Sequence, residues 1–317
     1  MKRIVLVFLL SVCANTCFSD EVLEIPANPE KGFRYPYLIK IPETVPEDKK
    51  LYLIVESNNT GKVSDDFSIH YESAKNTIVG NAVGPWLSKK LSYPILMPVF
   101  PRPESQWQVY THALDRDSMQ VESLPYERLD LQLIAMIEDA KRVLAERSLD
   151  LQQKIILAGF SASGTFANRF SLLHPETTEI VVAGGLNGTL MLPIGSMGEH
   201  NLKYPLGISD YKQVTGKEFN LSQWLKIKQF LFMGENDTND AVAYDDAYSE
   251  EERVIIYKTT GKEIQPERWN NSQKIYLESK ARVIFRTFEG VGHGTNGDVH
   301  RDFLAFVKKN ALQGSGQ

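Results

Sequence analysis

Short apolar runs alternate with segments of helical periodicity along most of this chain, and that alternation constrains its fold more than any other feature. The apolar runs have the length of strands and lie at 34–41, 51–55, 93–100, 154–158, 179–183, 229–233 and 282–288. The segments between them have a helical character, at 68–91, 129–144, 162–174 and 298–309. Strands that alternate with helices predict an α/β fold, with a mostly parallel central sheet and helices on both faces. Such a sheet brings the loops that follow its strands together along one edge.

The N-terminus has the pattern of a secretory signal peptide. Lys2 and Arg3 precede an apolar run at 4–10, and small or polar residues lead from there to Ser19. The apolar run is too short to span a bilayer as a stable helix, so we expect no stable membrane span. We predict a signal peptide over 1–19 and a secreted or periplasmic protein.

Both cysteines of the chain, Cys13 and Cys17, fall inside this N-terminal segment. A lipid anchor on one of them is an alternative to cleavage, and a buried N-terminal strand is another. A mature chain without cysteine has no disulfide, no thiol nucleophile and no cysteine-based zinc site. We expect neither a metal nor a cofactor. The rest of the chain predicts one α/β domain over 20–313 and a disordered tail over 314–317.

Composition narrows the class of partner. The 317 residues are 42% hydrophobic and 24% charged, with a formal net charge of −5. A chain of this kind can bury a large core and is not typical of disordered proteins. Its mild acidity, without any long basic block, argues against a nucleic-acid partner.

A nucleophilic serine is predicted where the run at 154–158 meets the helical segment. The sequence over 159–164 reads Gly-Phe-Ser-Ala-Ser-Gly. A reactive serine needs a sharp strand-to-helix turn with small neighbours, because the backbone is crowded there. The usual pattern is Gly-x-Ser-x-Gly, and here Ser163 takes the last position with Gly164 directly after it. We predict Ser161 as the nucleophile, with an ordinary Ser/Gly-rich turn as the alternative.

An acidic loop follows the apolar run at 229–233 and reads Glu-Asn-Asp-Thr-Asn-Asp over 235–240. A carboxylate at such a strand end can orient a catalytic histidine and stabilise its charged form. Asp237 is the predicted acid and Asp240 its rival. Calcium binding is another use of such a loop, although its spacing does not fit an EF-hand.

A general base is predicted in the last loop of the sheet. The sequence Gly-Val-Gly-His-Gly over 290–294 follows the last apolar run and precedes the last helical segment. Flanking glycines leave His293 free to reach Ser161. The chain order of Ser161, Asp237 and His293 is that of α/β-hydrolases and differs from the chymotrypsin and subtilisin types.

An acyl-transfer site also needs donors for the developing oxyanion. The backbone N–H of Ala162, directly after the nucleophile, is one predicted donor. The second should come from the loop after the second apolar run, where Asn58 and Asn59 are the predicted sources. An ordinary Asn/Gly turn is the alternative for that loop.

The substrate pocket is predicted less directly. Trp107 and Tyr110 follow the apolar run at 93–100 and are candidates for its wall, although aromatic residues also pack in cores. The stretch at 187–224 is long and irregular between two predicted strands. It is too long for a simple connection, and we interpret it as a lid insertion over the site.

These residues resemble the α/β-hydrolase superfamily across nearly the whole mature chain. The acidic loop looks like that of cutinase-type polyester hydrolases, and the serine turn is similar to those of bacterial esterases and polyhydroxyalkanoate-depolymerase-like enzymes. Ser163 in place of glycine and the Asn-Asn-Thr-Gly loop at 58–61 depart from those patterns. The resemblance implies cofactor-free hydrolysis of a small or polymeric carboxylic ester. A peptidase or amidase with the same triad, and a non-catalytic binding protein on this fold, are the alternatives.

Overall fold

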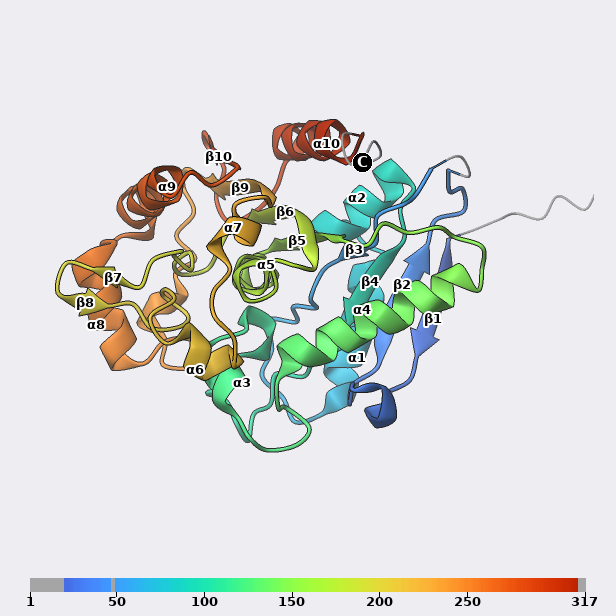
Figure 1. Cartoon of the computed structure of the whole chain (residues 1–317), viewed down its shortest axis with the longest axis horizontal. Helices are drawn as coiled ribbons and strands as arrows, with labels where there is room; N and C mark the ends of the chain where they lie inside the picture. The colour runs from blue at the N-terminus through green and yellow to red at the C-terminus, as the bar shows by residue number, and fades with distance from the viewer. Residues whose placement is uncertain (1–19, 47–48, 313–317) are drawn as a thin grey trace, which may run out of the picture.

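The computed structural model describes residues 20–46 and 49–312, so the predicted signal peptide and tail lie outside the described residues. An eight-stranded sheet runs through the molecule (Figure 1). Its strands lie in the order β1 (Glu21–Ile25), β2 (Tyr37–Ile41), β4 (Ile95–Pro98), β3 (Ile54–Val55), β5 (Ile155–Phe160), β6 (Thr178–Gly184), β9 (Lys228–Gly234) and β10 (Val283–Phe288). β2 is antiparallel to both of its neighbours, and the other neighbouring strands are parallel. The predicted mostly parallel sheet is confirmed.

Helices cover both faces of this sheet (Figure 1). α2 (Val83–Leu91) and α10 (Gly297–Leu312) lie on one face, and α4 (Leu129–Ala145) and α5 (Ala162–Leu173) lie on the other. The segment predicted as one helix over 68–91 is two helices, because α1 (Phe67–Ile78) ends before Gly80, a poor helix former. The remaining helices, which the sequence analysis did not predict, are α3 (Arg116–Gln120), α6 (Tyr211–Thr215), α7 (Leu221–Trp224), α8 (Glu250–Thr259) and α9 (Trp269–Glu278).

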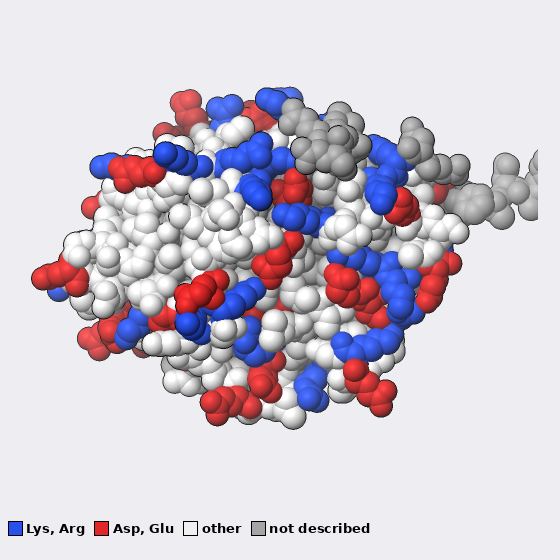
Figure 2. Space-filling model, in the orientation of Figure 1, with Lys and Arg blue, Asp and Glu red and all other residues white. Residues whose placement is uncertain are grey.

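The predicted lid segment at 187–224 is an excursion between β6 and β9. It contains α6, α7 and a small hairpin of β7 (Ser196–Met197) and β8 (His200–Asn201). Several of its large side chains, such as Tyr204 and Trp224, are fully buried, so much of the segment packs as part of the body. On the face shown in Figure 2, uncharged side chains form a broad area at the left of the view, whereas acidic and basic side chains are interspersed elsewhere.

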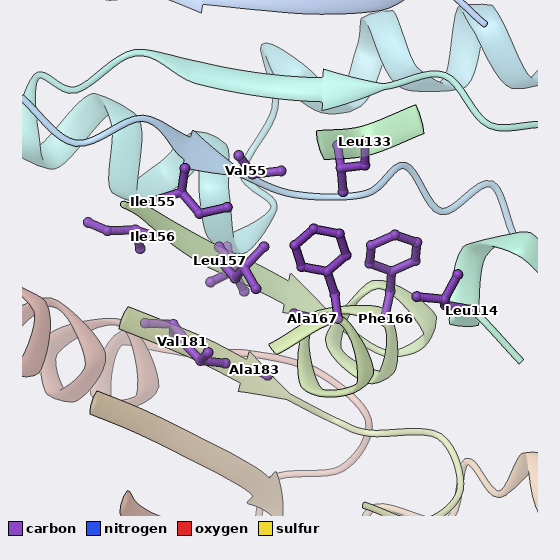
Figure 3. Close-up of a cluster of buried hydrophobic side chains, with 14 of the residues drawn as sticks. Val55, Leu114, Leu133, Ile155, Ile156, Leu157, Phe166, Ala167, Val181 and Ala183 are labelled. Carbon is purple, nitrogen blue, oxygen red and sulfur yellow. The ribbon is translucent and has the colours of Figure 1, made fainter. Parts of the chain in front are cut away.

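The core lies on both sides of the central strands. β5 and β6 are buried over nearly their whole length, as expected for parallel strands covered by helices on both faces. In Figure 3, Leu133 of α4 and Phe166 of α5 lie together above β5, and both are almost completely buried. This packing holds the first turn of α5 at the carboxyl end of β5. None of the described helices is long and apolar enough to cross a bilayer.

Candidate active site

Ser161 sits at a strained turn between β5 and α5. Its backbone has φ 61° and ψ −128°, a combination that residues other than glycine rarely adopt. The strand ends at Phe160 and the helix begins at Ala162, so one residue makes the whole turn. The packing of both elements supports this strain and leaves the serine at the edge of the sheet, as a nucleophile requires.

Small residues around the turn are needed for space. A Cβ added to Gly159 would lie 2.3 Å from the carbonyl oxygen of Ser163, and one on Gly164 would lie 2.6 Å from the carbonyl oxygen of Gly184 in β6. Both distances are far below van der Waals contact. Glycine is therefore required at 159 and at 164.

Asp237 and His293 are brought together from two neighbouring strand ends. Nδ1 of His293 lies 2.9 and 3.0 Å from the two carboxylate oxygens of Asp237. The carboxylate is almost completely buried, while the imidazole is 28% exposed. A buried carboxylate at this distance holds the hydrogen on Nδ1 and leaves Nε2 as a base.

Asp240, the predicted rival, has a different partner. Its two carboxylate oxygens accept from the guanidinium of Arg268 at 2.9 and 2.7 Å. Oδ1 also accepts from the backbone N–H of Val242 at 3.0 Å and caps a short 3₁₀ turn. Asp240 therefore holds the loop and a buried arginine, and of the two carboxylates Asp237 is the one that contacts the histidine.

The acid loop and the histidine loop are joined by their backbones. The N–H of Asn236 donates to the carbonyl of Val291 at 2.9 Å, and the N–H of Gly290 donates to the side chain of Glu235 at 3.0 Å. The ring of Phe160 packs against His293 with ring centroids 4.7 Å apart. The variable position of the serine turn thus supports the imidazole, a role that the sequence pattern did not indicate.

The amide of Asn239 lies between the nucleophile and the base. Its Nδ2 is 3.1 Å from Nε2 of His293 and 3.5 Å from Oγ of Ser161. With the Nδ1 hydrogen directed at Asp237, Nε2 carries a single lone pair, and Asn239 donates to it here. In the described part of the chain, Ser161 and His293 make no direct hydrogen bond to each other. Each instead lies within hydrogen-bond distance of this amide. Catalytic hydrogen bonds are often loose before a substrate binds.

The predicted oxyanion donors lie in two different settings. Ala162 begins α5, where the first N–H groups of a helix have no intrahelical acceptor and favour negative charge. Asn58 is fully buried, and its side chain exchanges two hydrogen bonds with the backbone of Phe100, at 2.8 and 2.9 Å. The Asn58 side chain therefore links two strand ends from a buried position and does not line the pocket. Asn59 lines the pocket beside Ser161.

A pocket of about 520 Å³ opens next to the serine. Its walls come from the segments that follow five strands, β3, β4, β5, β6 and β9. They are formed by Asn59, Thr60, Gly61, Arg102, Tyr110, Ser161, Asn187, Asn239, Ala241, Tyr244 and Asp246. Tyr110 lines it, as predicted. Trp107 does not line it and is 45% exposed. Of the predicted lid, only Asn187 contributes to the wall.

Sequence reasoning missed several residues of this pocket. Arg102 stands in a Pro-Arg-Pro sequence directly after β4, and its position at a strand end was the only signal for it. Asp246 and Tyr244 belong to an irregular stretch beyond the acid loop, where no pattern distinguishes a pocket residue from a surface residue.

A buried carboxyl group supports the serine turn from behind. Glu56, directly after β3, accepts from the N–H of Gly84 in the first turn of α2 at 2.5 Å and from the hydroxyl of Ser163 at 3.2 Å. Oγ of Ser163 is also 2.9 Å from both the N–H and the carbonyl of Phe160. The side chain at 163, where glycine is usual, therefore ties the turn to Glu56. Burial raises the pKa of Glu56 to about 7.

This raised pKa gives a pH-dependent stability that Glu56→Gln should remove. The unfolded chain has a carboxyl pKa near 4.5, so stability is fully present below that pH and is lost as pH rises through about 7. A glutamine can accept from the N–H of Gly84 through its oxygen and donate to Oγ of Ser163 through its nitrogen, without ionising. We expect the free energy of unfolding of Glu56→Gln minus that of wild type to be more positive at pH 9 than at pH 5, by on the order of 3 kcal/mol. Denaturant unfolding at both pH values measures it.

Glu122, which is exposed, provides the matched control. Glu122→Gln should follow the wild-type stability at each pH. An identical pH dependence in wild type and Glu56→Gln would contradict the assignment of the titrating group.

No family model matches this sequence, and no curated protein matches it. Solved structures do resemble it. Poly(aspartic acid) hydrolase-1 from Sphingomonas sp. KT-1 superposes with a TM-score of 0.56 at 13% identity, over 91% of this chain and 97% of that one. TT1662 from Thermus thermophilus gives 0.50 at 16% identity, over 92% and 97%. MGS-M1, an α/β hydrolase from a Medee basin deep-sea metagenome library, gives 0.49 at 13% identity, over 93% and 98%. By its sheet, its strand-end site and its likeness to the first two of these structures, the chain has an α/β-hydrolase fold.

Proposed function

We propose that this chain is a serine hydrolase that cleaves carboxylic esters through an acyl-enzyme intermediate, with Ser161 as nucleophile, His293 as base and Asp237 as orienting acid. The observation that supports this most is the buried carboxylate of Asp237, 2.9 Å from Nδ1 of His293, beside a serine in a strained strand-to-helix turn. A solvent-exposed imidazole edge next to a polar pocket is consistent with access for a substrate.

The proposed reaction follows from these roles. As Ser161 Oγ attacks the ester carbonyl, Nε2 of His293 takes the hydroxyl proton, and the buried Asp237 stabilises the imidazolium. The N–H of Ala162, with a second donor from the Asn59 loop, stabilises the oxyanion. His293 then protonates the leaving alcohol. Water, deprotonated by His293 in turn, hydrolyses the acyl-enzyme.

Asn239 must give way before this reaction begins, because its amide occupies the lone pair of His293 Nε2 that Ser161 needs. We expect Asn239→Ala to increase the rate of covalent labelling by a fluorophosphonate several-fold. Stopped-flow or gel-based labelling kinetics measure it. A decrease of tenfold or more would instead place the amide among the groups that assist the reaction.

The function itself is tested by assaying purified protein against esters of graded acyl length and against aminoacyl amides. Hydrolysis of esters, together with stoichiometric fluorophosphonate labelling, is the expected result. Hydrolysis confined to amides would select the peptidase or amidase alternative, which the same triad serves. If the protein shows neither turnover nor labelling, the alternative that remains is a binding protein on this fold.

A further inference from the structure

The pocket beside Ser161 contains an arginine that is fixed in place but incompletely bonded. Arg102 is 8% exposed, and its guanidinium lies 3.9 Å from the centroid of the Tyr110 ring. Nη2 pairs with the carboxylate of Asp246. Nε is buried without a hydrogen-bond partner. Nη1 makes no hydrogen bond to any group in the described part of the chain. The stacking and the ion pair therefore hold a cation whose donors are only partly used.

The rest of the wall favours an oxygen-rich ligand over an alkyl chain. Ala241 is the only aliphatic side chain among the described residues that line the pocket, whereas pockets for apolar ligands are lined mostly by apolar side chains. Oη of Tyr110 accepts from Asn187 at 3.5 Å, so its own hydrogen can be donated to a ligand. Among the lining residues described, Arg102 is the only cation.

A carboxylate is the group that this arrangement recognises best. Guanidinium groups bind carboxylates through short, charge-assisted hydrogen bonds, and stacking on Tyr110 orients the guanidinium before a ligand arrives. Asp246 occupies one nitrogen only and is itself partly exposed, so it leaves room for a second anion. Nη1 of Arg102 donates to no group in the described part of the chain, so it is the nitrogen that remains for a carboxylate in the pocket.

We propose that Arg102 binds a carboxylate of the substrate, so that Ser161 acts on esters that carry a carboxylate near the scissile carbonyl. This inference rests on the proposed function and names its substrate class. It predicts discrimination between substrates of equal size that differ only in that charge.

Two matched ester pairs test it. Monomethyl glutarate and the methyl ester of glutaric monoamide differ in charge on the acyl side, and acetylglycolate and acetylglycolamide differ in charge on the alcohol side. We expect kcat/KM to favour the carboxylate by at least tenfold in one pair. Arg102→Met should reduce that preference ratio about 10- to 100-fold. Asp246→Asn, which removes the competing anion, should increase it.

Arg147, a half-exposed arginine on the turn after α4, serves as the control, and Arg147→Met should leave the ratio unchanged. The Asp246→Asn variant keeps the test valid if Arg102→Met fails to fold, which thermal unfolding will show. Ester turnover with no preference for the carboxylate in either pair, or a preference that neither variant changes, would overturn this inference alone. Absence of turnover and of fluorophosphonate labelling would instead overturn the proposed function.

Discussion

Replacing Ser161 with alanine is expected to lower ester turnover by about 10⁴-fold or more and to abolish fluorophosphonate labelling. The reason is that the neighbouring hydroxyl of Ser163 cannot take its place, because it is held by Glu56 and by the backbone of Phe160, behind the turn. Steady-state kinetics and labelling of the same preparation measure both effects.

Stability separates this result from misfolding. Alanine must adopt the same backbone with φ near 61°, and it loses no buried hydrogen bond, so Ser161→Ala should unfold within a few degrees of wild type. Ser196, exposed in the small β7–β8 hairpin, gives the control, and Ser196→Ala should be labelled like wild type. Undiminished labelling of Ser161→Ala would refute the nucleophile assignment.

The second large effect is expected from Asp237→Asn. An asparagine at this position keeps the shape of the side chain but can donate to Nδ1, which favours the wrong tautomer of His293. We expect kcat to fall by about 10⁴-fold, while thermal stability changes little. Turnover and thermal unfolding of the purified variant measure the two quantities.

Asp240→Asn is the matched comparison, because it makes the same chemical change three residues away. Its carboxylate pairs with Arg268, which is 1% exposed. Asparagine leaves that buried charge partly unpaired, so this variant should lose on the order of 2 kcal/mol of stability and retain kcat within about tenfold. A loss of turnover in Asp240→Asn at full stability, with an active Asp237→Asn, would transfer the role of the acid to Asp240.

Glu56 is a structural feature that links stability to the site. It joins the end of β3, the first turn of α2 and the serine turn through one carboxyl group. A glycine at position 163, where glycine is usual, would deprive the Glu56 carboxyl group of its hydrogen bond from the Ser163 hydroxyl. Ser163 and Glu56 therefore form a pair. Their hydrogen bond gives the physical reason for a serine at a position where glycine is usual.

Several features were determined by the sequence alone. Local periodicity reflects which face of a strand or helix is buried, so the alternation of apolar runs and helical segments was sufficient to predict the parallel sheet and its helices. Strand ends then placed Ser161, Asp237 and His293 at one edge, because parallel strands share the direction of their carboxyl ends. The helices α8 and α9 were not predicted, and the single Gly80 ended a helix that was predicted to continue to residue 91.

Only the tertiary structure decided which side chains meet. The sequence favoured Asp237 and left Asp240 as its rival. The contacts that distinguish the two depend on Arg268, 28 residues beyond Asp240, and on the backbone link between the acid and histidine loops. The same holds for Arg102 and Asp246, which are separated by 144 residues. Such pairs form because of the path of the chain and the direction of each side chain, neither of which leaves a pattern in a local stretch of sequence.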